Sequence, residues 1–204
     1  MHIAIVGNIG AGKTTLTGML AKHYGYEALY EAVENNPYLE DFYSDMKRWS
    51  FNLQIYFLNS RFQQIVDIQN FNRNVIQDRT IYEDAHIFAD NLHEMGLMTT
   101  RDHHNYKAIF TNITSFIKPP DLLVYLRASV PTLVNNIQRR GREYEAGIRI
   151  DYLSKLNEKY EAWIKDYKLG NLLILDKDKL DFSNNPEDLG TIIQAIDAEI
   201  NGLF

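Results

Sequence analysis

The sequence of 204 residues contains no cysteine. Without thiols, the chain forms no disulfide bonds, no zinc–thiolate sites and no iron–sulfur clusters. It also lacks an apolar run long enough to span a bilayer, and it opens on a short strand pattern instead of a charged segment and an apolar signal core. These absences favour a cytoplasmic protein with no membrane partner.

Positive charge is scarce as well. There are 21 lysines and arginines against 27 aspartates and glutamates, which gives a formal net charge of −6. This balance argues against general nucleic-acid binding, but a local basic cluster suffices to bind one nucleotide. A hydrophobic content of 45% is ordinary for a globular protein with a sizeable core, and the length predicts a single domain, residues 1–204, with a small lid.

The most specific motif lies at the start of the chain. A short apolar run over residues 3–6 leads into G-x-x-x-x-G-K-T, and a helical pattern follows over residues 15–23. This strand, loop and helix together predict a phosphate-binding P-loop, whereas a glycine-rich turn that binds nothing is the alternative. The residues expected to bind the phosphates of ATP are Gly7, Asn8, Ile9, Gly10, Ala11, Gly12, Lys13, Thr14 and Thr15.

Each part of the motif has a physical role. The glycines let backbone N–H groups close around phosphate oxygens, and the helix N-terminus adds partial positive charge aimed at the same anion. Lys13 is expected to reach the β- and γ-phosphates, and the Thr14 hydroxyl is expected to ligate Mg²⁺.

Short apolar runs alternate with longer helical patterns along the rest of the chain. Strands are expected over residues 3–6, 27–30, 75–77, 122–126 and 172–175. Further helices are expected over residues 49–69, 82–94, 101–117, 130–140, 151–167 and 186–201. This alternation predicts a doubly wound α/β domain: a five-stranded parallel sheet flanked by helices, with ligands at the carboxyl ends of the strands.

Asp78 and Arg79 follow the third expected strand. A carboxylate at the end of a strand beside the P-loop is the Walker-B arrangement, which holds Mg²⁺ or its water shell. The neighbouring guanidinium is suited to bridging phosphate or another carboxylate with two hydrogen bonds. The alternative is an ordinary surface ion pair that closes a strand.

Glu31 directly follows the second expected strand, over residues 27–30. If that strand lies beside the first, the Glu31 carboxylate faces the γ-phosphate position and can accept a proton as general base. Glu34 is the competing candidate, but it more resembles a solvated charge ahead of Asn36, which is expected to cap a helix that starts at Pro37. An exposed charge is the alternative for Glu31 also.

Three arginines, Arg139, Arg140 and Arg142, stand within four positions of an acidic chain. Arginines followed by Gly141 also form a routine helix end. Together with a P-loop, they favour a mobile arginine-rich lid, at about residues 139–147, that brings positive charge to the transferring phosphoryl group and excludes water.

Helical spacing suggests a pocket for the acceptor. Gln54 and Arg61 are seven residues apart on one helix face, and Asp84 and Phe88 are four apart on another helix. An amide, a guanidinium, a carboxylate and an aromatic ring suit the edge and face of a nucleobase, although such residues are also common in ordinary helix packing. His103 and His104 lack a third ligand at metal spacing and are expected at the surface of a helix.

These motifs together resemble the deoxyadenosine/deoxyguanosine/deoxycytidine kinase family of deoxynucleoside kinases, and the resemblance runs over nearly the whole chain. The matching segments are residues 7–14, 31–33, 36–39, 48–51 with Gln54, 78–84, and 140–142 with Glu145. The resemblance implies a P-loop kinase fold, transfer of the ATP γ-phosphate to the 5′-hydroxyl of a 2′-deoxynucleoside with Mg²⁺, and a homodimer.

The resemblance also implies residue roles. Glu31 is the general base, Arg79 steadies it, Arg140 and Arg142 are the lid arginines, and Asp78 contacts Mg²⁺ through water because it is shorter than the glutamate of many relatives. The remaining implied residues are Tyr43 and Glu145 for the sugar 3′-hydroxyl, Gln54, Arg61, Asp84 and Phe88 for the base, and Asp181 and Phe182 for the adenine of the donor.

The most detailed prediction concerns which nucleobase the deoxynucleoside substrate carries. The segment over residues 78–84 looks closest to bacterial deoxyadenosine kinases, and Ala85 leaves room for a purine where some relatives carry arginine. Gln54 is able to pair bidentately with adenine, whereas guanine requires Asp84 to move or protonate, and deoxycytidine stays possible. One departure is Ala32, which stands where the family often has proline.

Other nucleotide-dependent functions make different demands on the sequence. A nucleoside-monophosphate kinase needs basic groups around the phosphate of its acceptor, and Glu31 would repel that phosphate. A guanine-nucleotide switch requires an Asn-Lys-x-Asp stretch late in the chain, which the sequence lacks. A non-catalytic partner subunit of a heterodimeric kinase stays open at this point.

Overall fold

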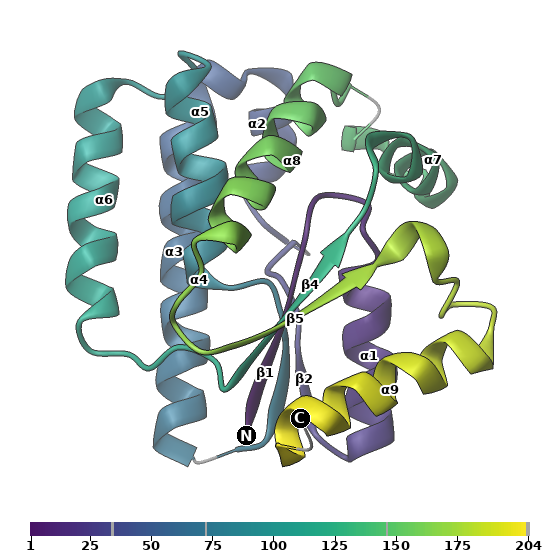
Figure 1. Cartoon of the computed structure of the whole chain (residues 1–204). Helices are drawn as coiled ribbons and strands as arrows, with labels where there is room; N and C mark the ends of the chain where they lie inside the picture. Colours follow the sequence, from purple (N-terminus) through teal and green to yellow (C-terminus); the bar gives the residue numbers. More distant parts are fainter. Residues whose placement is uncertain (34, 72, 146, 203–204) are drawn as a thin grey trace.

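The computed structural model describes residues 1–33, 35–71, 73–145 and 147–202, and within them five parallel strands form one sheet (Figure 1). The order across the sheet is β2-β3-β1-β4-β5. The strands are β1 (His2–Val6), β2 (Glu27–Leu29), β3 (Val75–Asp78), β4 (Leu122–Arg127) and β5 (Asn171–Asp176). All five residues of β1 are buried, as expected for a central parallel strand covered on both faces.

Helices cover both faces of the sheet. They are α1 (Lys13–Tyr24), α2 (Leu39–Ser44), α3 (Met46–Phe71), α4 (Ile81–Glu83), α5 (Asp90–Glu94), α6 (Thr100–Thr114), α7 (Val130–Arg140), α8 (Ile150–Lys165) and α9 (Pro186–Asn201). Shorter turns are the π-helix η1 (Asp84–Ala89) and the 3₁₀ turns η2 (Glu143–Glu145) and η3 (Lys177–Lys179). Every helix in the described ranges is too short or too polar to cross a membrane.

Alternate side chains of β1 enter two separate cores. Ala4 and Val6 pack with α3, η1, α6 and α8, whereas Ile3 and Ile5 pack with α1 and α9. Figure 1 shows α3, α6 and α8 on one side of the sheet and α1 and α9 on the other. The doubly wound architecture predicted from the alternation of apolar runs and helical patterns is therefore confirmed.

The order and register of the sheet place the polar residues at one edge. Ile5 of β1 lies beside Asp78 of β3, and β2 pairs with β3 on its outer side. The P-loop after β1, the chain after β2 and the chain after β3 therefore leave the sheet at the same edge.

One local prediction is wrong. The helix expected to start at Pro37 begins at Leu39, because Asn36 closes a turn in which its Oδ1 accepts the Tyr38 N–H at 3.0 Å and its Nδ2 donates to the Ala32 carbonyl at 3.1 Å. The helix expected over residues 82–94 is present as α4, η1 and α5, and only the π-helical turn in its middle was not expected. Glu34 lies outside the described residues, as does residue 146 of the expected lid.

Candidate active site

Two adjoining cavities open at the carboxyl edge of the sheet. The first has a volume of about 410 Å³ and the second about 320 Å³. Gly10, Lys13, Thr14, Arg140 and Arg142 line both of them. The first cavity is otherwise lined by the chain after β2, by side chains of α2 and α3, and by residues that follow β3. The P-loop and the arginine segment therefore stand between two ligand-sized spaces.

The P-loop is built to receive an anion. Gly10 has φ +85°, and a Cβ there would lie 2.7 Å from the Leu133 carbonyl oxygen, so only glycine fits. Lys13 is buried and donates from Nζ to the Asn8 carbonyl at 3.0 Å. Burial and the nearby Arg79 lower the pKa of Lys13 to about 8. A bound phosphate would supply the missing countercharge for this ammonium group.

Thr14 and Asp78 form the candidate Mg²⁺ site. The Thr14 hydroxyl donates to Asp78 Oδ2 at 2.6 Å, and Asp78 is 1% exposed. Its other oxygen, Oδ1, is buried with no hydrogen-bond partner among the residues that the structure describes. A hydroxyl and a carboxylate beside the P-loop are the oxygen donors that Mg²⁺ prefers, so the two residues fit the ion.

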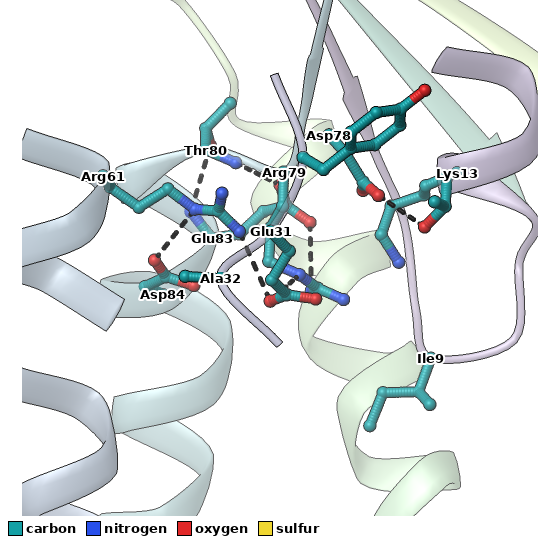
Figure 2. Close-up of polar contacts among 12 residues, drawn as sticks. Ile9, Lys13, Glu31, Ala32, Arg61, Asp78, Arg79, Thr80, Glu83 and Asp84 are labelled. Atoms are coloured by element: carbon teal, nitrogen blue, oxygen red, sulfur yellow. Dashed lines mark hydrogen bonds and ion pairs between the residues drawn. The ribbon is translucent and has the colours of Figure 1, made fainter. Parts of the chain in front are cut away.

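Glu31 projects into a cluster of positive charge at the wall of the first cavity (Figure 2). Its Oε1 lies 2.9 Å from Arg79 Nε and 3.3 Å from Arg61 Nη2. Burial alone would raise the pKa of the carboxyl, but Arg79, Arg61, Lys13 and Arg142 together hold it below the usual value for glutamate. Glu31 is therefore ionised at neutral pH and able to accept a proton.

Arg79 is the most constrained residue of the site. Its backbone has φ +73°, a left-handed conformation that is unusual for a residue with a side chain. The backbone N–H donates to the Ile5 carbonyl at 2.9 Å, and the guanidinium lies over the Phe88 ring at 4.5 Å. Such strained residues persist only where surrounding contacts determine them, and they cluster at functional sites.

Three buried polar groups line the first cavity or contact residues that do. Gln54, Arg61 and Asp84 are at most 3% exposed, and Gln54 and Asp84 line the cavity in the described structure, whereas Arg61, which was also expected there, does not. Arg61 Nε lies 3.6 Å from Asp84 Oδ2, yet neither atom has a well-formed hydrogen bond within the described ranges, and Gln54 Oε1 has none either. Leaving a buried polar atom unpaired costs roughly 1–3 kcal/mol, so these groups indicate a polar ligand edge.

The pKa of Asp84 follows from its surroundings. Burial raises it, and Arg61 and Arg79 only partly offset this rise, which leaves the pKa at about 7. The neighbouring carboxylates of Glu31 and Glu83 raise it further. Asp84 therefore changes its charge near neutral pH, and with it the hydrogen bonds that it offers to a ligand.

Asp84 and Phe88 both lie in the π-helix η1, and both line the first cavity. Single π turns inside α-helices often occur at functional sites. No sequence signal used above distinguishes this turn from an α-helix, although the T-x-x-E capping pattern of Thr80 and Glu83 marks where the helix starts.

The arginine segment closes over the same cavity. Gly141, with φ +66°, ends α7, so the segment also forms the helix end that was the alternative interpretation of its sequence. Arg140 Nη2 lies 2.6 Å from Glu145 Oε1, and Arg142 Nη1 lies 3.5 Å from the same atom. The Tyr43 ring stacks on Tyr144 with 5.6 Å between centroids. The structure thus brings Tyr43 and Glu145 to the wall that the arginines share.

Two predicted donor residues are placed elsewhere. Phe182 is 1% exposed and packs below the P-loop, where a Cβ at Gly12 would lie 3.2 Å from its ring. Asp181 accepts hydrogen bonds from the Asn184 side chain. Neither lines the second cavity in the described structure, whereas Lys177 and Ser183 do. Lys177 and Ser183 therefore line the second cavity on this side, and the role of Asp181 and Phe182 in binding the donor stays a prediction.

His103 also differs from its prediction. His104 is exposed, but His103 is half-buried, because α6 packs on α5. His103 Nε2 lies 2.7 Å from Asp90 Oδ1, and its ring stacks on His93 at 4.3 Å. Among the described residues, no group of three or more acidic, histidine or cysteine side chains is arranged to hold a metal ion.

Comparison with known proteins points to one family. A family model described as deoxynucleoside kinase matches residues 3–201. The chain is 37% identical to the deoxyadenosine/deoxycytidine kinase of Bacillus subtilis, over 98% of this chain and 93% of that protein. It is 38% identical to the deoxyguanosine kinase of Lactobacillus johnsonii, over 97% and 92%. A solved structure of deoxyadenosine kinase from M. mycoides with bound dATP superposes with a TM-score of 0.86 at 34% identity, covering 97% of this chain and all of that one.

Proposed function

The chain belongs to the deoxynucleoside kinase family, and we propose that it transfers the γ-phosphate of ATP to the 5′-hydroxyl of a purine 2′-deoxynucleoside, with deoxyadenosine preferred. The observation that carries this proposal is the position of Glu31. Its ionised carboxylate lies at the wall of a cavity that Lys13, Thr14, Arg140 and Arg142 also line.

We propose a role for each end of the first cavity. The base of the nucleoside meets Gln54, Asp84 and Phe88, which line the cavity, and its hydrogen-bonding edge satisfies unpaired buried atoms, while Arg61 contacts Asp84 from outside the lining. The sugar then lies toward Tyr43 and Glu145, and its 5′-hydroxyl toward Glu31 and the P-loop. This arrangement orients the alcohol before any chemistry takes place.

Proton transfer and charge stabilisation follow from the same residues. Glu31 accepts the proton of the 5′-hydroxyl as that oxygen attacks the γ-phosphorus, while Arg79 holds the carboxylate in place. Lys13 and the arginines Arg140 and Arg142 stabilise negative charge on the transferring phosphoryl group. Mg²⁺, held by Thr14 and Asp78, would neutralise charge on the phosphate oxygens of the donor.

The site fits a nucleoside acceptor better than a nucleotide acceptor. The two arginines nearest to Glu31 are already engaged by carboxylates, Arg61 by Glu31 and Asp84, and Arg79 by Glu31 and Glu83. A phosphate on the acceptor beside Glu31 would meet that carboxylate, and the two arginines nearest to it are already paired with carboxylates.

The test is turnover of a panel of deoxynucleosides by the purified protein with ATP and Mg²⁺. We expect phosphorylation of deoxyadenosine with the highest kcat/KM, followed by deoxyguanosine or deoxycytidine. Phosphorylation of deoxynucleoside monophosphates but not of nucleosides would refute the proposal, as would a protein that needs a second subunit for any turnover. The expected homodimer and cytoplasmic location stay predictions.

We also expect the base preference to depend on pH. Ionised Asp84 accepts a hydrogen bond from the adenine amino group, whereas protonated Asp84 donates one to the guanine carbonyl. Because burial raises the pKa of Asp84 to about 7, the ionised fraction grows as pH rises through neutrality. The ratio of kcat/KM for deoxyadenosine to that for deoxyguanosine should rise by about tenfold or more between about pH 6 and about pH 8.

The variant Asp84→Asn is the control for this dependence, because it keeps the shape of the side chain and removes its titration. A wild-type ratio that is flat with pH, or an equal pH dependence in the variant, would remove Asp84 from this role.

A further inference from the structure

A buried polar network contacts Nη1 of the Arg79 guanidinium, whereas Glu31 contacts its Nε. Its members are Glu83 in α4 and Tyr160 in α8, both 0% exposed. Neither lines the cavity that holds Glu31 in the described structure, so neither is placed to touch a substrate. We propose, on the basis of the function proposed above, that Tyr160 and Glu83 are positioning residues that hold Arg79, and through it the Glu31 carboxylate, in register with the P-loop.

The contacts make one continuous chain from the P-loop to Glu31. Arg79 Nη1 donates to the Tyr160 hydroxyl at 3.0 Å and lies 3.4 Å from Glu83 Oε1. The Tyr160 hydroxyl lies 2.6 Å from Glu83 Oε1 and 2.9 Å from the Gly7 carbonyl, and either oxygen can accept its proton. The Gly7 N–H in turn donates to Glu83 Oε1 at 3.2 Å. The first glycine of the P-loop and the guanidinium of Arg79 therefore share the same two partners.

Glu83 is itself fixed by the start of its helix. Its Oε2 accepts the Thr80 N–H at 2.9 Å, and its own N–H donates to Thr80 Oγ1 at 3.3 Å (Figure 2). This reciprocal capping box leaves Oε1 free to receive Gly7, Tyr160 and Arg79. Because hydrogen bonds fix both carboxylate oxygens of Glu83, this side chain is able to hold the Arg79 guanidinium in place.

Arg79 needs such support because of its backbone. A residue with a side chain favours a negative φ, so Arg79 keeps its φ of +73° only while its contacts hold it there. On the other side of the guanidinium, Nε lies 2.9 Å from Glu31. Any rotation of Arg79 away from Tyr160 therefore moves the group that orients Glu31, and a displacement of about 1 Å at a reacting group is able to cost about 10²-fold in rate.

The test is the variant Tyr160→Phe, which keeps the ring stacked on Tyr125 and removes only the hydroxyl. We expect kcat to fall by about tenfold while KM for nucleoside and for ATP changes by less than about twofold. The carboxyl of Glu31 faces Arg79, Arg61, Lys13 and Arg142, and Arg79 is the strongest of these in lowering its pKa. If Arg79 is held less firmly, it lowers the pKa of Glu31 by less. The acid limb of the plot of kcat against pH should then move to higher pH.

The matched control is Tyr24→Phe, which removes a hydroxyl that lies 2.9 Å from Asp197 at the far end of α1. It is expected to keep the wild-type kcat and pH profile. Glu83→Gln is the second variant, and it is expected to act in the same direction as Tyr160→Phe. The carboxyl carbon of Glu31, followed by ¹³C NMR against pH in the ligand-free protein, reports on Arg79 without requiring turnover.

The outcomes separate the two proposals. A wild-type protein that phosphorylates no deoxynucleoside overturns the proposed function. Wild-type turnover with an unchanged kcat and an unchanged Glu31 titration in Tyr160→Phe overturns the positioning role alone. If Tyr160→Phe does not fold, the same two measurements on Glu83→Gln decide the question.

Discussion

The variant Glu31→Gln is expected to lower kcat by about 10²–10⁴-fold while KM for the deoxynucleoside changes by only a few-fold. Glutamine has the same shape and keeps a carbonyl oxygen that accepts hydrogen bonds from Arg79 and Arg61, but it cannot take a proton from the 5′-hydroxyl. The loss should therefore appear in the chemical step. Single-turnover measurements with saturating ATP and nucleoside separate that step from binding and release.

A matched control lies on the strand just before this residue. Glu27 is exposed and pairs with Arg73 at 2.8 Å outside both cavities, so Glu27→Gln should leave kcat unchanged. An unchanged kcat in Glu31→Gln would remove Glu31 from the role of general base. A rise in KM without a fall in kcat would make it a binding residue only.

The pH profile of the wild-type enzyme bears on the same assignment. Because Arg79, Arg61, Lys13 and Arg142 outweigh the effect of burial, the pKa of Glu31 lies below the usual glutamate value. Loss of the ionised form at low pH should therefore begin at a lower pH than for an ordinary glutamate, provided that the arginines keep their places. A base with a low pKa is a modest acceptor, so most of its effect comes from position.

The parts of this molecule that the sequence predicted well are those encoded locally. The glycine spacing of residues 7–14 determines a backbone shape, and that shape alone makes a phosphate cradle. The strands are continuous apolar runs, because a parallel sheet is buried on both faces. Glu31 and Asp78 are predictable as candidates because each stands at or just after a strand end, where the fold collects functional groups, although the strand before Glu31 lies beside β3 and not beside β1.

The parts that the sequence did not predict depend on contacts between distant segments. Tyr160 and Gly7 are 153 positions apart, and nothing in the local pattern of either residue indicates the other. Phe182 follows the last strand, and the resemblance alone implies its contact with the adenine of the donor, whereas its burial beside Gly12 depends on distant packing. The residues around Asn36 form a side-chain turn whose hydrogen bonds competed successfully with helix capping.

The second large effect is expected at Arg142. The guanidinium lines both cavities, and its single described contact with Glu145 is long, at 3.5 Å. By contrast, Arg140 makes close bonds to both oxygens of Glu145, at 2.6 and 2.7 Å. Arg142 is therefore less tightly held than Arg140 and better able to contact the transferring phosphoryl group. In related phosphoryl-transfer enzymes, an arginine that stabilises this charge raises kcat by about 10³–10⁵-fold.

Arg142→Ala should accordingly lower kcat by about 10³-fold, with a smaller change in KM for ATP, measured in steady-state assays at saturating Mg²⁺. Arg149→Ala is the control, because Arg149 is an exposed arginine near the lid whose partner is Asp151, outside both cavities. Arg140→Ala is a less clean test, since it also leaves the buried Glu145 carboxylate with only a distant cation and so disturbs the sugar site. If Arg142→Ala raised KM for ATP and left kcat unchanged, Arg142 would bind the donor in the ground state alone, and Lys13 with Mg²⁺ would carry the stabilisation of the transition state.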